Sequence, residues 1–249
     1  MRIDWDYSAV ARSFSKRPPY ATATIDAFVR SAGVAPGMRA CDAGAGTGNL
    51  TLPLLARGLD VVAIEPCEAM RALGRRRTAG LAKVRWLAAC AESTGLRAEC
   101  VDLVTFGSSF NVVDRERALR EAARILKHGG AFVCLWNHRR LDDPLQAAIE
   151  ALIRRCVPAY EQGTRREDQT SIIGRSGFFG AVRKIEGEVV HRMTVTDCVE
   201  AWRSHLTLRR QAGKRFPEIL DAIRSLLVQA ACPCIDVPYT TRAWIARRD

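Results

Sequence analysis

The stretch MRACDAGAGTGN, residues 38–49, decides the fold of this chain. Its apolar start is typical of a buried strand, and the glycines that follow allow a tight turn whose backbone a ligand can approach closely. The next segment, LTLPLLARG over residues 50–58, reads as a helix that Gly58 ends. The N-terminal amides of such a helix point toward the turn. The sequence therefore predicts a strand, a glycine turn and a helix, which together make one βα unit.

Strand-like and helical segments alternate on both sides of this unit. A helix over residues 21–32 precedes it, and strands over 60–66, 83–89, 101–107 and 131–137 follow, with helices over 68–77 and 115–130 between them. After Asn137 we expect a helix over about 142–162, a strand over 182–193, helices from Asp197 and Phe216, and a last strand over 239–246. This order predicts an α/β fold with a seven-stranded, mostly parallel sheet, helices on both faces, N-terminal helices and a helical cap inserted after the fifth strand.

The 249 residues contain no internal repeat and no low-complexity linker. We therefore expect a single domain, with a lid over residues 1–36, a ligand-binding core over 37–137, a cap and late strand over 138–234, and a final strand over 235–249. No run approaches the roughly 18 apolar residues of a membrane span, and the start lacks the apolar centre of a secretion signal. These features predict a cytoplasmic protein without a membrane partner.

The charge distribution and the cysteine spacing bear on whether the protein binds nucleic acid or a metal. The net charge of +11 suits a polyanion, but the cations are dispersed apart from Arg75–Arg77 and the tail, so a solvated basic surface is favoured and nucleic acid is disfavoured. The nine cysteines lack the spacings of a disulfide framework. Cys232 and Cys234 have no second pair of ligands nearby, so we expect no metal site.

The glycine turn excludes two common phosphate-binding motifs. Counting from either glycine pair, the sixth position of a G-x-G-x-x-G pattern holds Asn49 or Thr51, so the dinucleotide fingerprint is absent. No G-x-x-x-x-G-K-[ST] motif is present either. Glu65 ends the second strand about twenty residues beyond the turn, where a carboxylate can accept both ribose hydroxyls of a nucleoside. The turn and Glu65 together predict a nucleoside cofactor.

Five segments now resemble the class I S-adenosylmethionine-dependent methyltransferases. They are CDAGAGTGNLT, VVAIEPCEAM, LAACAES, VDLVTFGSSF and EAARILKHGGAFVCLWN. The opening FSKRPPYATATIDAF resembles the small-molecule branch that includes ubiquinone-type and trans-aconitate-type methyltransferases, although a rigid entry to a helix would explain the same prolines. The stretch FGSSFN lacks the proline pair of adenine-type nucleic-acid methyltransferases, and there is a weaker similarity to azapteridine N-methyltransferases of the toxoflavin pathway.

The resemblance implies S-adenosyl-L-methionine as the cofactor. Cys90 stands where many relatives carry an Asp that accepts the adenine amino group, so Ala91 and Glu92 are expected to contribute there. The cofactor-binding residues that the resemblance implies are Gly44, Ala45 and Gly46 for the methionine part, Glu65 for the ribose, Pro66 and Met70 with Cys90, Ala91 and Glu92 for adenine, Gly107 and Ser108 for the methyl side, Arg17 for the carboxylate, and Tyr20 for the wall.

The acceptor is expected to be a small, heteroaromatic metabolite methylated at nitrogen or oxygen. His138 and Tyr7 are the candidate catalytic residues, with Asp6 as a further candidate base. The region after Asn137 contributes aromatic and apolar residues without a dense basic cluster. The candidate substrate residues are Trp5, Asn111, Trp136, Asn137 and Tyr239. Two alternatives stay open: an RNA-modifying methyltransferase, and a non-catalytic regulatory protein that binds S-adenosylmethionine. The sequence does not indicate an oligomeric state.

Overall fold

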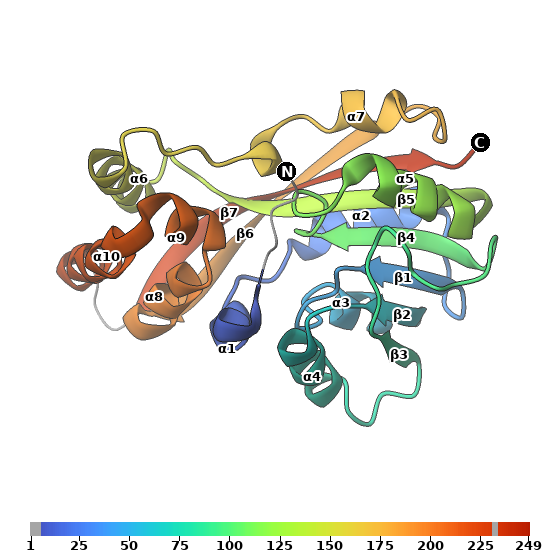
Figure 1. The fold of residues 1–249 in the computed structure, drawn as a ribbon, viewed down its shortest axis with the longest axis horizontal. Coiled ribbons are helices and arrows are strands. Elements are labelled where there is room, and N and C mark those ends of the chain that lie inside the picture. Colours follow the sequence, from blue (N-terminus) through green and yellow to red (C-terminus); the bar gives the residue numbers. More distant parts are fainter. Residues whose placement is uncertain (1–5, 231–233) are drawn as a thin grey trace.

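A computed structural model describes residues 6–230 and 234–249 (Figure 1). Its strands form one seven-stranded sheet in the order β3-β2-β1-β4-β5-β7-β6. Strands β1 to β5 are parallel, and β7 is antiparallel to both β5 and β6. The predicted fold class is therefore confirmed. The strands are β1 (Arg39–Ala43), β2 (Asp60–Ile64), β3 (Val84–Leu87), β4 (Val101–Gly107), β5 (Leu126–Arg139), β6 (Arg183–Thr194) and β7 (Cys234–Arg247).

The strand order reverses between β1 and β4, because the chain runs outward from β1 through β2 to β3 and then returns to the other side of β1. Ligands of open α/β sheets bind at such a point, beyond the carboxyl ends of the strands. Here the two strand ends are joined, since the side chain of Ser109 donates to the backbone oxygen of Ala43 at 2.6 Å. The topology thus predicts where the site lies.

Helices cover both faces of the sheet. Apolar side chains of α2 and α3 pack against one face, and those of α5 and α7 pack against the other. The helices are α1 (Ala11–Phe14), α2 (Thr22–Ala32), α3 (Thr51–Leu55), α4 (Glu68–Arg77), α5 (Arg115–Ile125), α6 (Pro144–Cys156), α7 (Thr170–Gly174), α8 (Val195–Arg203), α9 (Leu206–Ala212) and α10 (Phe216–Ala230).

The helix α6 is shorter than predicted, because Pro158 follows its end. A residue that precedes proline disfavours the helical conformation, and Val157 has φ −133° and ψ 83°. At the other end, Asp143 caps the helix by accepting from the Gln146 amide at 3.0 Å. The expectation of a helix to residue 162 was therefore wrong by about six residues.

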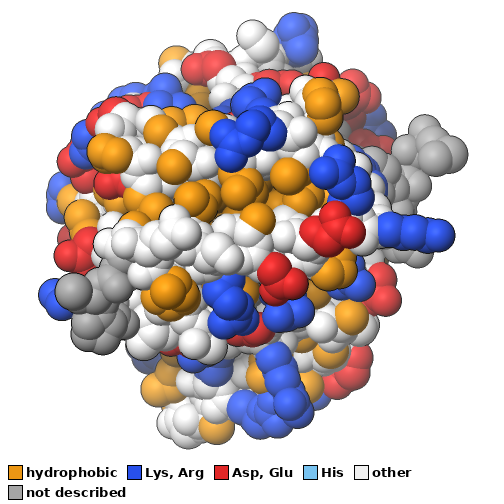
Figure 2. All heavy atoms as spheres, turned by 90° about the vertical axis from the view of Figure 1, so that its left-hand side faces the viewer, with side chains coloured by type: hydrophobic (Ala, Val, Ile, Leu, Met, Phe, Trp, Pro, Cys, Tyr) orange, Lys and Arg blue, Asp and Glu red, His pale blue; other side chains and the backbone are white. Residues whose placement is uncertain are grey.

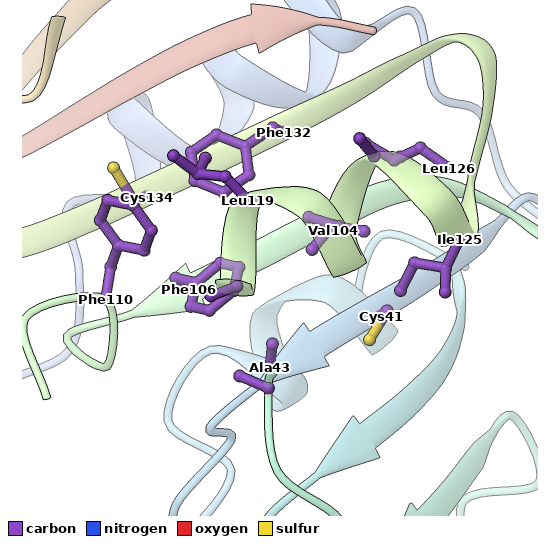
Figure 3. Packing of buried hydrophobic residues seen from close by; sticks show 14 of the residues in the cluster. Cys41, Ala43, Val104, Phe106, Phe110, Leu119, Ile125, Leu126, Phe132 and Cys134 are labelled. Atoms are coloured by element: carbon purple, nitrogen blue, oxygen red, sulfur yellow. The ribbon is translucent and has the colours of Figure 1, made fainter. Parts of the chain in front are cut away.

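Aromatic rings fill the core between α5 and strands β4 and β5 (Figure 3). The rings of Phe106, Phe110 and Phe132 lie with centroids 5.3 to 5.5 Å apart, in tilted or edge-to-face pairs. Leu119 of α5 lies beside them, whereas Ile125 lies at the far end of the same helix, near Cys41. Such ring geometry adds to the stabilisation from burial, and it fixes the end of β4 near the site.

A second hydrophobic cluster forms the cap, which consists of α6, α8, α9 and α10 with the outer parts of β6 and β7. The strand β7 serves both units: Ile235, Val237 and Tyr239 point into the cap, whereas Ala243 and Ile245 point into the sheet core. Figure 2 looks onto this end of the molecule, where hydrophobic side chains form a band with Lys and Arg around it. The cap is thus an extension of the sheet.

The N-terminal segment, residues 6–20, lies between the cap and the core. It contains a 3-10 turn, Ser8–Val10, and α1, which contacts α8 on one side and α4 on the other (Figure 1). Ser13 donates to Glu200 at 2.7 Å, and Lys16 pairs with Asp197 at 2.9 Å. None of the helices within 6–230 and 234–249 has both the length and the apolar character needed to cross a membrane.

Candidate functional site

A cavity of about 620 Å³ lies over the carboxyl ends of the strands, between the N-terminal segment and the cap. Asp6, the further candidate base, lines it, and so do seventeen other predicted site residues, which lie within residues 7–138 or at residue 239. They are Tyr7, Arg17, Tyr20, Gly44, Ala45, Gly46, Glu65, Pro66, Met70, Cys90, Ala91, Glu92, Gly107, Ser108, Asn137, His138 and Tyr239. Trp5 and Cys232 lie outside the described residues.

The glycine turn after β1 follows a path that requires glycine. Gly44 has φ 70°, and a Cβ added there would lie 2.5 Å from the Cβ of Ser109. The amides of Gly44 and Ala45 both donate to the backbone oxygen of Ile64, at 2.8 and 2.9 Å. The turn is therefore fixed to the end of β2, and it leaves open space where side chains would otherwise project.

Glu65 lies at the end of β2 with its carboxylate held by two backbone amides. One oxygen accepts from the Gly46 amide at 2.8 Å, and the other accepts from the Cys67 amide at 2.9 Å. Burial raises the pKa of Glu65, while the two amide hydrogen bonds oppose that change. Because each carboxylate oxygen can accept a second hydrogen bond, the group is oriented and still able to bind two hydroxyls.

Asp42 is a site residue that the sequence interpretation left out. It is fully buried at the end of β1 and accepts from the hydroxyls of Thr51 at 2.6 Å and Thr105 at 3.1 Å. Burial raises its pKa to about 6, although the two hydroxyl hydrogen bonds act in the opposite direction. The sequence did contain a signal for Asp42, because a charged residue inside an apolar strand, just before the glycine turn, needs polar partners.

Ser108, just beyond β4, adopts a backbone conformation that is unusual for a residue other than glycine. Its φ is 61°, and its amide donates to Leu135 at 2.8 Å. Its hydroxyl lies 2.9 Å from the Tyr20 hydroxyl. Such conformations concentrate at functional sites, where surrounding contacts hold them. The contact also joins the N-terminal segment to the end of β4.

The segment after β3 brings Cys90, Ala91 and Glu92 to the cavity wall. Ala91 is buried and Cys90 is half-buried. The carboxylate of Glu92 accepts from the Asp114 amide at 3.0 Å, just before α5. Glu92 therefore joins the cavity wall to the start of α5.

Two polar residues hold the N-terminal segment in place. Asn137 donates from its amide nitrogen to the backbone oxygens of Pro18 at 3.3 Å and Pro19 at 2.8 Å, and its oxygen accepts from Thr241 at 2.5 Å. Its amide is thus occupied by protein contacts. We predicted that Asn137 orients the substrate. Its contacts support a different role, which is to position Pro18 and Pro19.

Neither candidate catalytic residue, His138 or Tyr7, has a pKa close to 7, as an effective general base at neutral pH would. Burial, reinforced by the charges of Arg166 and Arg242, lowers the pKa of His138 to about 3. Burial raises the pKa of Tyr7 to about 12. His138 is therefore neutral and Tyr7 protonated at pH 7, so both can form hydrogen bonds with a bound molecule.

The structure corrects the prediction for Asn111 and Trp136. Neither residue lines the cavity, because the indole nitrogen of Trp136 donates to Asn111 at 2.9 Å and its ring packs edge-on against Trp244. Trp136 is 2% exposed. Successive residues of a strand point to opposite faces, so a position near the end of β5 does not ensure that a side chain faces the site.

The cap supplies a basic wall that the sequence interpretation did not foresee. Arg139, Arg165 and Arg166 line the cavity together with Tyr160 and Trp202. The expectation of no dense basic cluster after Asn137 was therefore wrong. Residues 165 and 166 are separated from Arg139 by α6, so their proximity arises only from the tertiary fold.

Comparison with known proteins identifies the part of the chain that carries the glycine turn and Glu65. Residues 41–134 match a methyltransferase domain. This methyltransferase domain runs from the second residue after the start of β1 to the middle of β5. Arg139, Arg165 and Arg166 lie beyond residue 134, so the basic wall is outside the matched segment.

Curated relatives match about half of the chain. A methyltransferase of Mycobacterium tuberculosis, named as uncharacterized, is 39% identical over 132 residues, which are 53% of this chain and 51% of that protein. A ubiquinone/menaquinone biosynthesis C-methyltransferase of Rubrivivax gelatinosus is 37% identical over 111 residues, which are 43% of each chain. The chain thus spans about half the length of the curated relatives it matches.

Solved structures resemble the chain over most of its length. The structure of Haemonchus contortus phosphoethanolamine N-methyltransferase 2 with phosphomonomethylethanolamine and S-adenosylhomocysteine has a TM-score of 0.53 at 17% identity, covering 91% of this chain and 52% of that one. At this identity the likeness establishes a shared fold.

Proposed function

We propose that this protein transfers a methyl group from S-adenosyl-L-methionine to a small-molecule acceptor. The observation that carries the proposal is the carboxylate of Glu65, which two backbone amides hold beside the glycine turn in the cavity wall. The methyltransferase domain at residues 41–134 supports it, because that domain contains both features.

The residues around the turn fit a nucleoside with an amino-acid tail. Glu65 retains acceptor capacity for both ribose hydroxyls, and Pro66 and Met70 offer an apolar surface for adenine. Gly44 and Gly46 would leave room for the methionine part, and Gly107 and Ser108 would lie on the side of its methyl group. The cofactor supplies an electrophilic methyl group on a sulfonium sulfur.

The chain's own contribution is to bind and orient the acceptor. His138 is neutral and Tyr7 is protonated at neutral pH, so neither is suited to remove a proton from a weakly acidic group. Holding the two reactants in line supplies a large part of a displacement's acceleration without a strong base. We therefore assign His138 and Tyr7 to hydrogen bonding with the acceptor.

The size and walls of the cavity favour a small acceptor. Its volume of about 620 Å³ lies in the range of small-molecule sites, and the cap and N-terminal segment enclose it. Trp202, Tyr160 and Tyr239 offer aromatic surface to a planar molecule. A heteroaromatic metabolite methylated at nitrogen or oxygen, such as an azapteridine, fits these walls.

The proposal is tested first by binding and then by turnover. Calorimetry should show S-adenosylhomocysteine binding far more tightly than NAD or ATP. Incubation of the purified protein with a metabolite extract and S-adenosylmethionine should produce a compound heavier by one methyl group, detected by mass spectrometry. Absence of S-adenosylhomocysteine binding would overturn the cofactor assignment, and binding without any methylated product would favour a regulatory protein.

A further inference from the structure

Three arginine side chains meet at the cap end of the cavity. Arg139 ends β5, and Arg165 and Arg166 lie in a 3-10 turn, Thr164–Arg166, between α6 and α7. The three come from two separate segments, and all of them line the cavity wall. The fold therefore gathers positive charge on one side of the site.

These guanidinium groups contact neutral partners. An Arg165 nitrogen lies 2.7 Å from Nε2 of His205, and Arg166 donates to the backbone oxygen of Arg139 at 3.3 Å. The Arg139 guanidinium stacks 3.8 Å above the Trp202 ring, and its buried Nε has no hydrogen-bond partner. Among the residues that the structure describes, none of the three forms a salt bridge.

Nearby carboxylates are already engaged. Glu150, the acid beside the cluster, lies 2.9 Å from Arg154 and accepts from Gln162 at 3.1 Å. Glu65 lies at the end of β2, and strands β1 and β4 separate β2 from β5, which ends at Arg139. The cap end consequently has an excess of positive charge.

Such an arrangement is costly without a ligand. Burial lowers the pKa of Arg165, and the charges of Arg139 and Arg166 lower it further, although Tyr160 and the single carboxylate of Glu150 act in the opposite direction. Charges deep inside a protein are usually paired, because water no longer screens or solvates them fully. The excess charge therefore indicates a site for a negatively charged molecule.

Two buried polar side chains in the same wall lack partners. Gln146 is 2% exposed and His138 is 4% exposed, yet within residues 6–230 and 234–249 neither the amide of Gln146 nor either ring nitrogen of His138 has a hydrogen-bond partner. Both line the cavity. Buried polar groups are normally hydrogen-bonded, so these atoms indicate a polar ligand between the arginines and the glycine turn.

We propose that the cap end of the cavity binds an oxyanion of the methyl acceptor, a carboxylate or a phosphate, through Arg139, Arg165 and Arg166. This inference rests on the proposed function in one respect, which is that the oxyanion belongs to the methyl acceptor. Guanidinium groups match planar and tetrahedral oxyanions with paired hydrogen bonds. The aromatic walls then hold the body of the acceptor, with Gln146 and His138 bound to its polar groups.

The test compares three small probes that share one ring: benzoate, phenyl phosphate and neutral benzamide. Their binding to the full chain is measured by calorimetry, with and without S-adenosylhomocysteine. At least one anion should bind about tenfold or more tightly than benzamide, a difference that one charged hydrogen bond supplies. The tighter anion tells which oxyanion the site prefers. Equal binding of all three probes would overturn the proposal.

Variants assign the binding to the cluster. Arg165→Met should weaken anion binding by about tenfold or more and leave benzamide binding unchanged, whereas Arg175→Met, at an exposed arginine outside the cavity, should change neither. If Arg165→Met fails to fold, Arg166→Gln provides the same comparison, because the Arg166 side chain makes a single hydrogen bond within the described part of the chain, to the backbone oxygen of Arg139. Unchanged anion affinity in a folded variant would refute the assignment.

The design separates this inference from the proposed function. Anion binding in a protein that binds no S-adenosylhomocysteine would reject the methyl transfer and keep the oxyanion site. Tight S-adenosylhomocysteine binding without preference for the anionic probes would keep the cofactor site and reject the oxyanion site.

Discussion

The guanidinium of Arg17 fastens the N-terminal segment to the cap through Ser204, because its Nε donates to the Ser204 hydroxyl at 2.9 Å and its Nη2 donates to the backbone oxygen at 2.8 Å. The same guanidinium stacks 3.9 Å from the Phe14 ring. Burial lowers its pKa to about 10, so the group stays charged at neutral pH. Arg17 lines the cavity, but its hydrogen bonds to Ser204 also give it a structural role.

Replacing Arg17 should therefore release the segment without unfolding the core. We expect Arg17→Met to increase the rate of proteolytic cleavage within residues 6–20 by about tenfold, the effect of losing roughly 1.5 kcal/mol of charged hydrogen bonding. Limited proteolysis followed by mass spectrometry measures the rate. Arg12→Met is the matched control, because Arg12 is exposed in the same segment. Equal cleavage in both variants would contradict the fastening role.

Glu65 provides the second prediction. Glu65→Ala should weaken S-adenosylhomocysteine binding by about 1.5 to 3 kcal/mol, the range for hydrogen bonds to a charged group, as measured by calorimetry. Glu116→Ala, at an exposed position outside the cavity, should leave the affinity unchanged. Affinity that survives the loss of Glu65 would remove the ribose assignment.

The third prediction separates two effects at the glycine turn. Gly44 and Gly95 have φ 70° and 71°, but a Cβ at Gly44 would collide with Ser109, whereas a Cβ at Gly95 would meet nothing within 4 Å. Gly95→Ala should cost about 1 to 2 kcal/mol from the backbone conformation alone. Gly44→Ala should cost more, and urea denaturation of both variants measures the difference. Equal losses would mean that Ser109 moves aside freely.

The fourth prediction concerns acid stability. The pKa of His138 is about 3 in the folded protein, whereas an exposed imidazole titrates near 6.5, so the unfolded chain binds the extra proton between these values. Stability therefore falls as the pH drops from about 6.5 toward 3. His205 contributes with the same sign, because burial also depresses its pKa.

His138→Gln should flatten this dependence by up to about 1.4 kcal/mol per pH unit. Urea denaturation at several pH values between 5 and 7.5 measures the slope. His128→Gln should leave it unchanged, since the His128 side chain is 73% exposed. If stability depends on pH equally in His138→Gln and in the unsubstituted protein, the pKa of His138 is not lowered by folding.

The residues at the ends of β1 and β2 that the sequence singles out do line the cavity, because the sequence signals for them are local. The glycine turn and Glu65 each follow a strand, and parallel strands bring their carboxyl ends to one edge of the sheet. The cap end has no such regularity. Arg139 and Arg165 line the same cavity because α6 and the turn after it fold back over the sheet. No hydrophobic periodicity in the sequence predicts the direction of that loop. The misplacement of Trp136 has the same origin, since its side chain direction depends on the register of β5.

The length of β6 and β7 limits how the molecule can open. Strand β7 pairs with β5 as far as Tyr239. Beyond that residue β6 and β7 remain paired with each other as far as Thr194 and Cys234, so the cap is attached to a two-stranded ribbon that continues from the sheet. Swinging the cap away would require this ribbon to bend near Tyr239, where the pairing with β5 ends and the side chains of Val237, Tyr239 and Thr241 are buried. We therefore expect the N-terminal segment, which Arg17 joins to the cap at Ser204, to move away from the cavity more readily than the cap does.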